Sequence, residues 1–310
     1  GRKSPATPIL LAIGWGSGIG GLGSPIGSSA NLVAISYFEK LSGKEFMYYD
    51  WVIRFLPVLA IIFIVNLLFI LFLPTTVKQL PGSKEYFLSL YESFGKMRKG
   101  EKIGLFLFVL SIVLSFLRPF FADLLPALRP AYIFFLCGFL MFFLKDEKGE
   151  AMLTWKYAES HVMWGMIFLF ASGLALGRLV IETGAVSQMA SLMAAKAPGE
   201  GLFLMASVAL FSVFMTELSS NTAAVSISIP VTTGIAEALS VNPVPYILCA
   251  VVASCCAYVL PVTTRAIPVS RGLSAAVQMK EGLKLTTITW LTITVTCYAF
   301  MKFFPLFNHV

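Results

Sequence analysis

Long apolar runs, divided by short polar or glycine-rich interruptions, dominate this chain. About 20 apolar residues suffice for a helix that crosses the hydrocarbon core of a bilayer. Continuous runs at 51–73, 162–180 and 283–304 predict helices that cross singly. Shorter runs at 103–121 and 124–144 predict a pair that crosses and returns. The pattern therefore predicts an all-α, polytopic membrane protein.

Two of the apolar runs are interrupted by residues that helices tolerate poorly. The run 8–37 contains a series of glycines from Gly14 to Gly27, and the run 246–269 is interrupted at 261–265, which begins with a proline. In a helix interior, glycine costs about 1 kcal/mol and proline about 3 kcal/mol. Both runs therefore predict discontinuous helices.

A polar cluster lies between two apolar segments that are each too short to cross comfortably. The segments are 202–215 and 223–239, and residues 216–222 between them have the sequence TELSSNT. Water cannot satisfy backbone or hydroxyl groups at membrane depth, so such a cluster persists only where protein, ion or substrate satisfies it. The cluster predicts the tip of a re-entrant hairpin and is a candidate binding site.

The distribution of basic residues orients the predicted spans. The loop 74–102 carries more Lys and Arg than Asp and Glu, which places it in the cytoplasm. Lys280 and Lys284 fall on the same side in the resulting topology. In this topology the first interrupted run leaves the cytoplasm, and the second returns to it.

An internal repeat relates the two interrupted runs. The sequences PIGSSA at 25–30 and PVTTRA at 261–266 share a proline, an aliphatic residue, a hydroxyl and an alanine in the same order. Two broken helices of opposite direction are typical of inverted-repeat secondary transporters, whose binding sites lie where the breaks meet near the midplane. The alternative interpretation is two unrelated proline kinks.

The repeat predicts a division of the chain into three parts. Residues 1–37 would form the broken helix of the first repeat within an incomplete transport domain, and 38–160 the connecting helices and a cytoplasmic loop. Residues 161–310 would form the second repeat, with its re-entrant hairpin and broken helix. Symmetry requires a hairpin before the first broken helix as well. We therefore expect that N-terminal helices and a first hairpin are missing from this sequence, and that these 310 residues do not transport alone.

Composition supports the membrane class and excludes others. The chain is 57% hydrophobic and only 13% charged, whereas a soluble protein with apolar core helices needs charged outer faces. Much of the basic excess behind the net charge of +7 lies between the apolar runs, so no nucleic-acid partner is expected. The five cysteines lie in apolar surroundings without metal-binding or disulfide spacing, and no cofactor is indicated.

Several motifs together resemble the divalent anion/sodium symporter family of the ion transporter superfamily. The TELSSNT cluster is the most specific of them, and the glycine-rich motif is the least specific. Further similar segments are Pro230, 241–243, 253–255, 260–262, WGMIFLFASGLAL at 164–176 and IGGLGSPIG at 19–27. The resemblance covers nearly the whole chain. It implies sodium-coupled transport of a dicarboxylate, citrate or sulfate by a homodimer in the lipid bilayer of the plasma (inner) membrane.

The resemblance also implies roles for individual residues, with sodium ions as coupling ions rather than cofactors. The implied contacts of the anionic substrate are Ser220, Asn221, Thr222, Ser28, Thr264 and Arg265. The implied sodium ligands are Thr216, Ser219, Asn221, Thr263 and Gly27, of which Gly27 belongs to the sodium site of the first repeat. Elementary chemistry agrees, because sodium prefers oxygen ligands and helix N-termini with hydroxyl and amide donors suit an anion.

The chain departs from the family pattern at both breaks. Where the family has Thr-Pro-Pro, this chain has SSA at 28–30 and TRA at 264–266, so the hydroxyls remain and the prolines are lost. We expect Arg265 to contact the substrate, because a charge near the midplane is costly unless it faces a cavity or an anion. Such a contact would suit a sulfate-like, phosphorylated or more highly charged carboxylate substrate. The alternative is that Arg265 snorkels to the cytoplasmic interface beside Arg271.

Other functions stay open at this point. An arsenite-type or proton-coupled anion permease of the same superfamily, or a homologue that no longer transports, would share these motifs. Glu217 is either a proton or cation site or a partner of backbone amides, and the second interpretation is favoured. Enzymatic activity is not expected, because the chain lacks a phosphate-binding glycine loop and a His-Glu-x-x-His motif, and Ser220 has no base in view.

Overall fold

The computed structural model describes residues 6–75, 82–162 and 201–309, together with scattered residues between 164 and 188. Within these residues the regular elements are helices, and one isolated bridge pairs Lys145 with Ala151. The prediction of an all-α protein is thus confirmed. The predicted span at 162–180 lies outside the continuously described segments.

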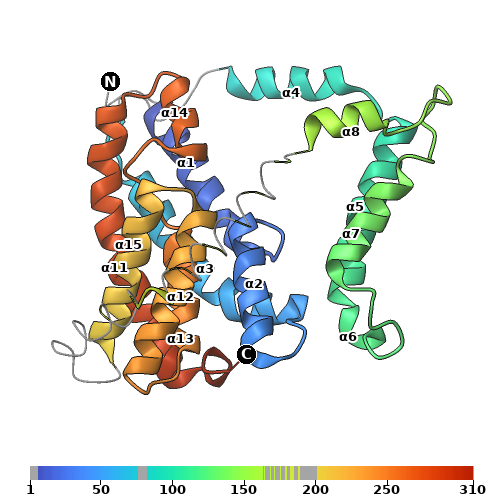
Figure 1. Ribbon diagram of the computed structural model, residues 1–310. Coiled ribbons are helices and arrows are strands. Elements are labelled where there is room, and N and C mark those ends of the chain that lie inside the picture. Colours follow the sequence, from blue (N-terminus) through green and yellow to red (C-terminus); the bar gives the residue numbers. More distant parts are fainter. Residues whose placement is uncertain are drawn as a thin grey trace. The chain divides into compact units, whose positions relative to one another are not determined.

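The chain forms two compact units (Figure 1). The large unit comprises Gly1–Phe46, Asp50–Val77 and Gly165–Val310, and the small unit comprises Met47–Tyr49 and Lys78–Trp164. The large unit therefore contains both interrupted runs and the polar hairpin. The three-part division expected from the repeat stays a prediction, because these units follow packing rather than repeat boundaries.

The first interrupted run forms two helices with an unwound segment between them. Helix α1 spans Ala6–Gly20, a 3-10 turn follows at Gly21–Gly23, and α2 spans Ser29–Ser42. The break is thus shorter than predicted, because α1 continues through the glycines that precede Gly21. In an apolar environment a helix satisfies its own backbone, and this gain outweighs the modest propensity cost of each glycine. Helix α3 then spans Tyr48–Leu71, close to the predicted 51–73.

The polar cluster and the second interrupted run supply the rest of the large unit. Helices α11 (Leu202–Leu218) and α12 (Asn221–Ala238) are joined by two residues and pack side by side (Figure 1). This arrangement is the predicted helical hairpin. Beyond it lie α13 (Val244–Ser254), the 3-10 turn Thr263–Arg265, α14 (Ala266–Ser270), α15 (Ala275–Phe303) and a terminal 3-10 turn at Pro305–Phe307.

The second break and the last long helix differ from their predicted bounds. The break begins at Cys255, immediately after α13, rather than at Pro261. Helix α15 begins at Ala275, about two turns before the predicted start at position 283. The additional turns of α15 bring Gln278 and Gly282 against the unwound segment, which explains why this charged stretch is helical although it is not apolar.

Helix α13 lies at the centre of the large unit. Every residue from Pro245 to Ser254 is buried, and α11, α12 and α15 pack against it. A helix that is apolar around its whole circumference has to be buried by neighbouring elements on all sides. Helix α12 also packs against α2, so the hairpin contacts the first broken helix directly. The core of the large unit therefore fixes the hairpin between the two breaks.

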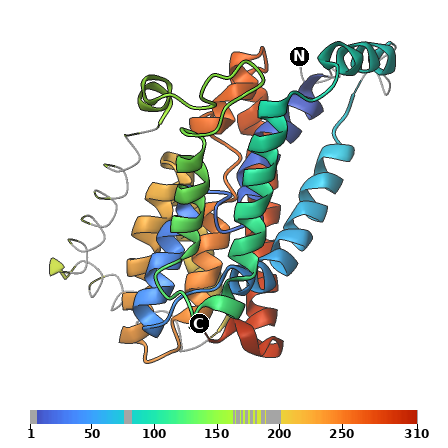
Figure 2. The same ribbon diagram turned by 90° about the vertical axis from the view of Figure 1, so that its right-hand side faces the viewer.

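The small unit is built on a helical pair. Its elements are α4 (Ser83–Phe94), α5 (Lys99–Phe116), α6 (Arg118–Phe121), α7 (Pro130–Leu140) and α8 (Trp155–His161). Helices α5 and α7 pack side by side (Figure 2), as the runs 103–121 and 124–144 predict. Arg118 is buried and holds the connection by donating hydrogen bonds to the carbonyls of Leu125 and Pro126. At the start of α5, hydrogen bonds from the Arg98 amide and side chain lower the pKa of Glu101.

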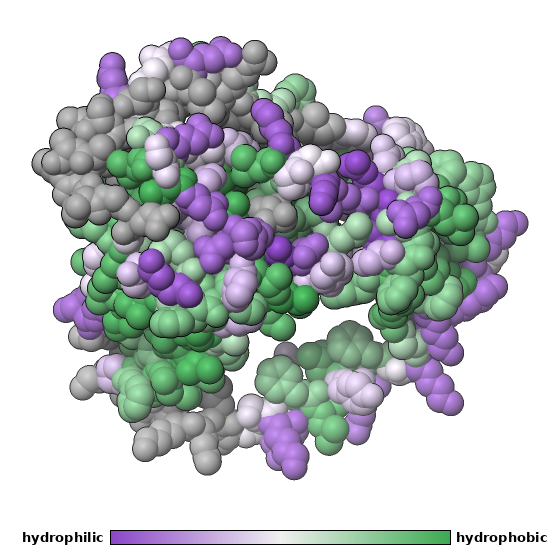
Figure 3. Space-filling model, turned by 90° about the horizontal axis from the view of Figure 1, so that it is seen from below, coloured by the Kyte–Doolittle hydropathy of each residue, from purple (hydrophilic) through white to green (hydrophobic). Residues whose placement is uncertain are grey.

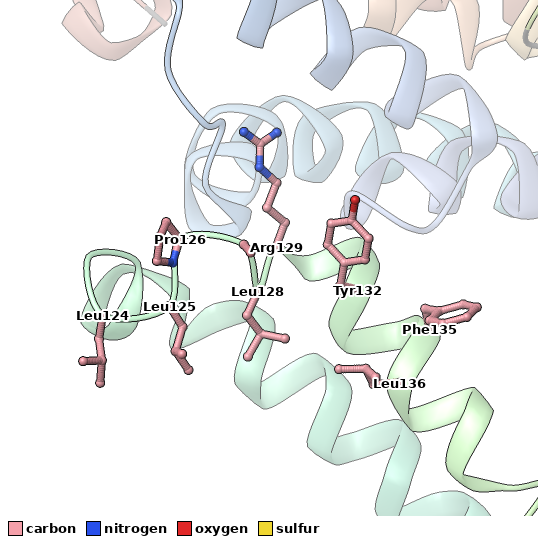
Figure 4. A pocket seen from close by; sticks show the side chains of 9 residues that line it. Leu124, Leu125, Pro126, Leu128, Arg129, Tyr132, Phe135 and Leu136 are labelled. Carbon is pink, nitrogen blue, oxygen red and sulfur yellow. The ribbon is translucent and has the colours of Figure 1, made fainter.

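The connection between α6 and α7 lines an open hollow of about 1000 Å³ (Figure 4). Leu124, Leu125 and Leu128 point to one side of it, and the polar ends of Arg129 and Tyr132 point to the other. The wall is mostly apolar and comes from one short stretch of chain. The hollow holds none of the predicted site residues.

Large apolar side chains are exposed over much of the surface (Figure 3). Phe72, Phe120 and Phe303 each have more than 80% of their surface exposed, as lipid-facing residues would. Two described stretches, Ala6–Gly23 and Tyr48–Leu71, are long and apolar enough to cross a membrane by length and composition alone. Shorter apolar helices are Pro130–Leu140, Leu202–Leu218 and Val244–Ser254.

A pair of glycines in α1 tests the packing of the two broken helices. A Cβ added at Gly14 would lie 2.6 Å from Cγ of Pro268 in α14, whereas one added at Gly16 would meet nothing within 4 Å. We expect Gly14→Ala to destabilise the protein by roughly 1–3 kcal/mol, because a proline ring cannot move aside. Gly16→Ala is the control, and it should be neutral or stabilise by up to about 1 kcal/mol. Thermal unfolding in detergent measures both, and equal midpoints for the two variants would contradict this packing.

Candidate functional site

The hairpin tip is ordered by its own side chains. Ser220 caps α12 by accepting a hydrogen bond from the amide of Ala223 at 3.2 Å. The Thr216 hydroxyl donates to Oδ1 of Asn221 at 3.0 Å, and the Ser219 hydroxyl donates to the carbonyl of Met215 at 2.7 Å. Serine is a strong N-cap because its oxygen replaces a partner that the first turn of a helix lacks. The polar side chains of the tip therefore form hydrogen bonds with the backbone of the hairpin and with one another.

The first break is a tightly built loop. Nδ2 of Asn31 donates to the carbonyls of Gly21 and Ser24, both at 2.8 Å, and Nε1 of Trp51 donates to the carbonyl of Leu22 at 2.8 Å. A Cβ added at Gly27 would overlap the carbonyl oxygen of Gly21, so only glycine fits there. These contacts hold the carbonyl oxygens of an unwound segment in fixed positions.

The hairpin tip and the first break meet. The hydroxyls of Ser29 and Thr222 lie 2.6 Å apart, and Thr222 is buried. Ser29 begins α2 and Thr222 lies in the first turn of α12, so two helix N-termini converge. Helix N-termini carry partial positive charge and unpaired amides, which favours anions. The structure thus brings Ser28, at the N-cap of α2, close to the tip residues 220–222.

The second break is held by one carboxylate. Glu217 accepts hydrogen bonds from three consecutive amides, those of Tyr258 at 2.6 Å, Val259 at 3.0 Å and Leu260 at 3.0 Å. Nε1 of Trp15 donates to the Tyr258 carbonyl at 3.1 Å. The interpretation of Glu217 as a partner of backbone amides is confirmed. A buried carboxylate is stable in this position because charged hydrogen bonds surround it.

Arg265 is buried and bound by groups of the protein. Its side chain is only 4% exposed and forms an ion pair with Glu217 at 2.8 Å. Nη2 also donates to the carbonyls of Thr216 at 2.9 Å and Ser219 at 3.4 Å. The guanidinium therefore faces protein groups at the end of α11, and its burial argues against snorkelling beside Arg271. The physical reason is that the end of a helix leaves carbonyls without partners, and a cation at that end satisfies them. Its contact with a substrate stays a prediction.

The remaining predicted residues are more dispersed. Thr263 and Thr264 are exposed, and the Thr263 hydroxyl donates to the neighbouring carbonyl of Val262 at 2.7 Å. No hydrogen bond joins either threonine to the hairpin tip in the described part of the chain. Gly27 is also exposed, and its amide donates to the carbonyl of Ser24 at 3.0 Å. Their roles as ligands stay predictions.

Several residues that build the site were not expected from the sequence. Asn31 is fully buried, and its Oδ1 accepts no hydrogen bond from the described residues. Asn66 donates to the Tyr258 hydroxyl at 3.2 Å, and a Cβ added at Gly282 would overlap the Tyr258 carbonyl oxygen. The two asparagines carried a usable signal, because each is a lone amide inside an apolar run. Gly282 carried none, because its importance comes from a distant segment.

The family follows from a comparison with known proteins. A family model described as "CitMHS: Citrate transporter" matches residues 1–253 and 131–307, which together cover almost the whole chain. The chain belongs to this family. The resemblance to the divalent anion/sodium symporters is thereby confirmed, and the membership of a transporter family agrees with the expectation that the chain is not an enzyme. It also makes the chain an integral membrane protein.

Individual curated transporters are also similar to this chain. The sodium-dependent dicarboxylate transporter SdcS of Staphylococcus saprophyticus is 27% identical over 264 residues, which are 83% of this chain and 51% of the relative. The transporter of the same name from Staphylococcus aureus strain MRSA252 is 26% identical over 304 residues, which are 94% of this chain and 58% of the relative. The chain thus spans about half the length of the curated relatives it matches.

Gly282 tests the backbone positions of the second break in this citrate transporter family member. We expect Gly282→Ala to push the Tyr258 carbonyl away and to weaken the three amide contacts of Glu217. Cys255 and Cys256 begin the break and are buried, so their alkylation by N-ethylmaleimide should accelerate roughly tenfold or more. Peptide mass spectrometry measures the rates, with buried Cys297 in α15 as the internal reference. Gly138→Ala is the control, because a Cβ there meets nothing within 4 Å. Unchanged rates in Gly282→Ala would contradict the tight contact.

Proposed function

We propose that this protein takes part in sodium-coupled transport of a small dicarboxylate across the plasma membrane. The observation that carries the proposal is the 2.6 Å contact between Ser29 of the first break and Thr222 of the hairpin tip. It joins two oxygen-rich interruptions that lie 193 positions apart in the sequence, inside one packed unit. Converging helix breaks are where inverted-repeat transporters bind their solutes.

The substrate carboxylates would bind at the two helix N-termini. The first turns of α2 and α12 offer backbone amides, and Ser28, Ser220, Asn221 and Thr222 add hydroxyl and amide donors beside them. Ser28, Ser220 and Asn221 are half-buried, so their donors are reachable from one side. Thr264 would close the site from the second break. A dicarboxylate has two acceptor groups, which matches two converging N-termini better than a single charge would.

Sodium would bind to the oxygens of the first break. The carbonyls of Gly21 and Ser24 each accept a hydrogen bond from Asn31, and the Ser24 carbonyl also accepts one from the amide of Gly27. Oδ1 of Asn31 is buried and accepts no hydrogen bond from the described residues, so this oxygen can coordinate a cation. The carbonyl of Gly27 would complete this set. A hard cation prefers oxygen ligands, and an adjacent sodium ion would offset the charge of the anion.

The position of Arg265 narrows the substrate class. A direct contact with Arg265 was the reason to consider sulfate-like, phosphorylated or more highly charged substrates. Its guanidinium pairs with Glu217 at 2.8 Å, and this pairing supports a substrate class that needs no contact with Arg265. The names of the relatives, sodium-dependent dicarboxylate transporters, support the simpler dicarboxylate.

Coupling to sodium is favoured over coupling to protons. Glu217 is the one acidic residue of the hairpin tip, and its carboxylate already accepts three amide hydrogen bonds and an ion pair. Both carboxylate oxygens of Glu217 are thus engaged by groups of the protein. A homodimer remains part of the proposal through the family resemblance.

Sodium-dependent binding of succinate tests the proposed function. With succinate at about 100 times its Kd, the purified chain in detergent should gain roughly 2.7 kcal/mol of stability in sodium chloride. We expect most of the gain to disappear in choline chloride and in Asn221→Ala. Asn242→Ala is the matched control, because Asn242 lies in the exposed turn between α12 and α13 and should leave the gain intact. Equal stabilisation in choline would favour the proton-coupled or arsenite-type alternative, and equal stabilisation of Asn221→Ala would refute the tip as the binding locus.

A further inference from the structure

The end of α11 is occupied by a side-chain cation. Helix α11 ends at Leu218, and Ser219 is its C-cap residue, with an extended backbone. Nη2 of Arg265 donates to the carbonyls of Thr216 and Ser219, and Nη1 contacts Glu217 between them in sequence. The guanidinium is thus bound at the negative end of a half-helix.

The same place is where a coupling cation is expected. In transporters with broken helices, unwound carbonyls and the C-terminal ends of half-helices coordinate sodium. Thr216 and Ser219 are two of the residues to which the family resemblance assigns sodium in the second repeat. In this chain their carbonyls accept hydrogen bonds from Arg265 instead. The predicted sodium ligands and the predicted substrate contact therefore form one cluster.

We infer that the Arg265 guanidinium takes the place of a coupling sodium ion in the second half of the site. This inference rests on the proposed sodium-coupled function and refines it. A second cation on the same carbonyls would be repelled by the guanidinium a few ångströms away. Arginine also keeps its charge at every physiological pH, so the built-in cation is permanent.

The first half of the site provides the contrast. The carbonyls of Gly21 and Ser24 accept hydrogen bonds from the neutral amide of Asn31, and no basic side chain is recorded on them within the described residues. The buried Oδ1 of Asn31 has no hydrogen-bond partner there. One half of the site therefore has an oxygen free to take sodium, and the other half already holds a positive charge. The two halves should differ in their need for sodium.

The contacts of Glu217 allow a sodium ion to replace the guanidinium without loss of the fold. Glu217 keeps its three amide donors when Arg265 is neutralised, so the second break retains its main support. The freed carbonyls of Thr216 and Ser219 and the negative charge of Glu217 would then form a site that attracts a cation. Sodium is the available ion of the right hardness.

Arg265→Gln tests the inference through the sodium dependence of succinate binding. Succinate affinity is measured by calorimetry on the purified chain across a series of sodium concentrations at constant ionic strength. We expect the slope of log Kd against log sodium concentration to become steeper by about one sodium ion in Arg265→Gln. Affinity at low sodium should fall at least about tenfold and recover at high sodium. Arg265→Lys keeps the charge and should keep the slope of the unaltered chain.

The outcomes separate this inference from the proposed function. A sodium-dependent chain whose slope is the same in Arg265→Gln would overturn the inference and leave the function standing. A chain that binds succinate without sodium, and gains sodium dependence in Arg265→Gln, would overturn sodium coupling and support the inference. If Arg265→Gln does not fold, the inference is tested by the number of radioactive sodium ions that the unaltered chain binds at equilibrium. The inference expects at most about one ion per chain at saturating succinate, and two or more would refute it.

Discussion

Backbone that leaves a helix inside an apolar environment must find new hydrogen-bond partners, and this constraint organises the large unit. The three unwound segments each receive partners from elsewhere in the fold or from their own side chains. Asn31 and Trp51 form hydrogen bonds with the backbone of the first break. Glu217 and Trp15 do the same in the second break, and Ser220 caps α12 at the tip. Because lipid offers no alternative partner, a missing contact would leave a buried amide or carbonyl at a cost of several kcal/mol.

These partners also tie the segments to one another. Glu217 belongs to the hairpin but satisfies amides of the second break, and Trp15 of the first broken helix bonds the carbonyl of Tyr258 in the same break. Thr222 joins the tip to Ser29 of the first break. The two breaks and the tip therefore move only together or by exchanging partners. A ligand that bound at one of them, as proposed, would act on the other two through these contacts.

The sequence predicted those elements whose bounds depend on neighbouring residues. It did not predict those whose bounds depend on contacts with residues far away in the sequence. The hairpin was predictable because the polar cluster at 216–222 is anomalous between apolar runs, and α12 begins inside it. The early start of the second break at Cys255 was not predictable, because its amides depend on Glu217, about 41 positions earlier. Likewise, the position of Arg265 in an apolar run indicates that its charge needs a partner. The sequence does not indicate whether that partner is a substrate or Glu217.

In the second break, Arg265 stands where the resemblance to the symporter family implies a proline. Proline fixes a break by covalent geometry, whereas Arg265 fixes it by an ion pair and two carbonyl contacts. The neighbouring Thr263 has a φ of 57°, which costs a residue with a β-branched side chain roughly 1–2 kcal/mol. Such strain persists only where the flanking structure is held firmly, and Arg265 and its carbonyl contact with Gln278 lie directly after it. An ion pair can therefore hold this break where a proline would hold it by covalent geometry, and unlike proline it places a charge beside the proposed sodium site.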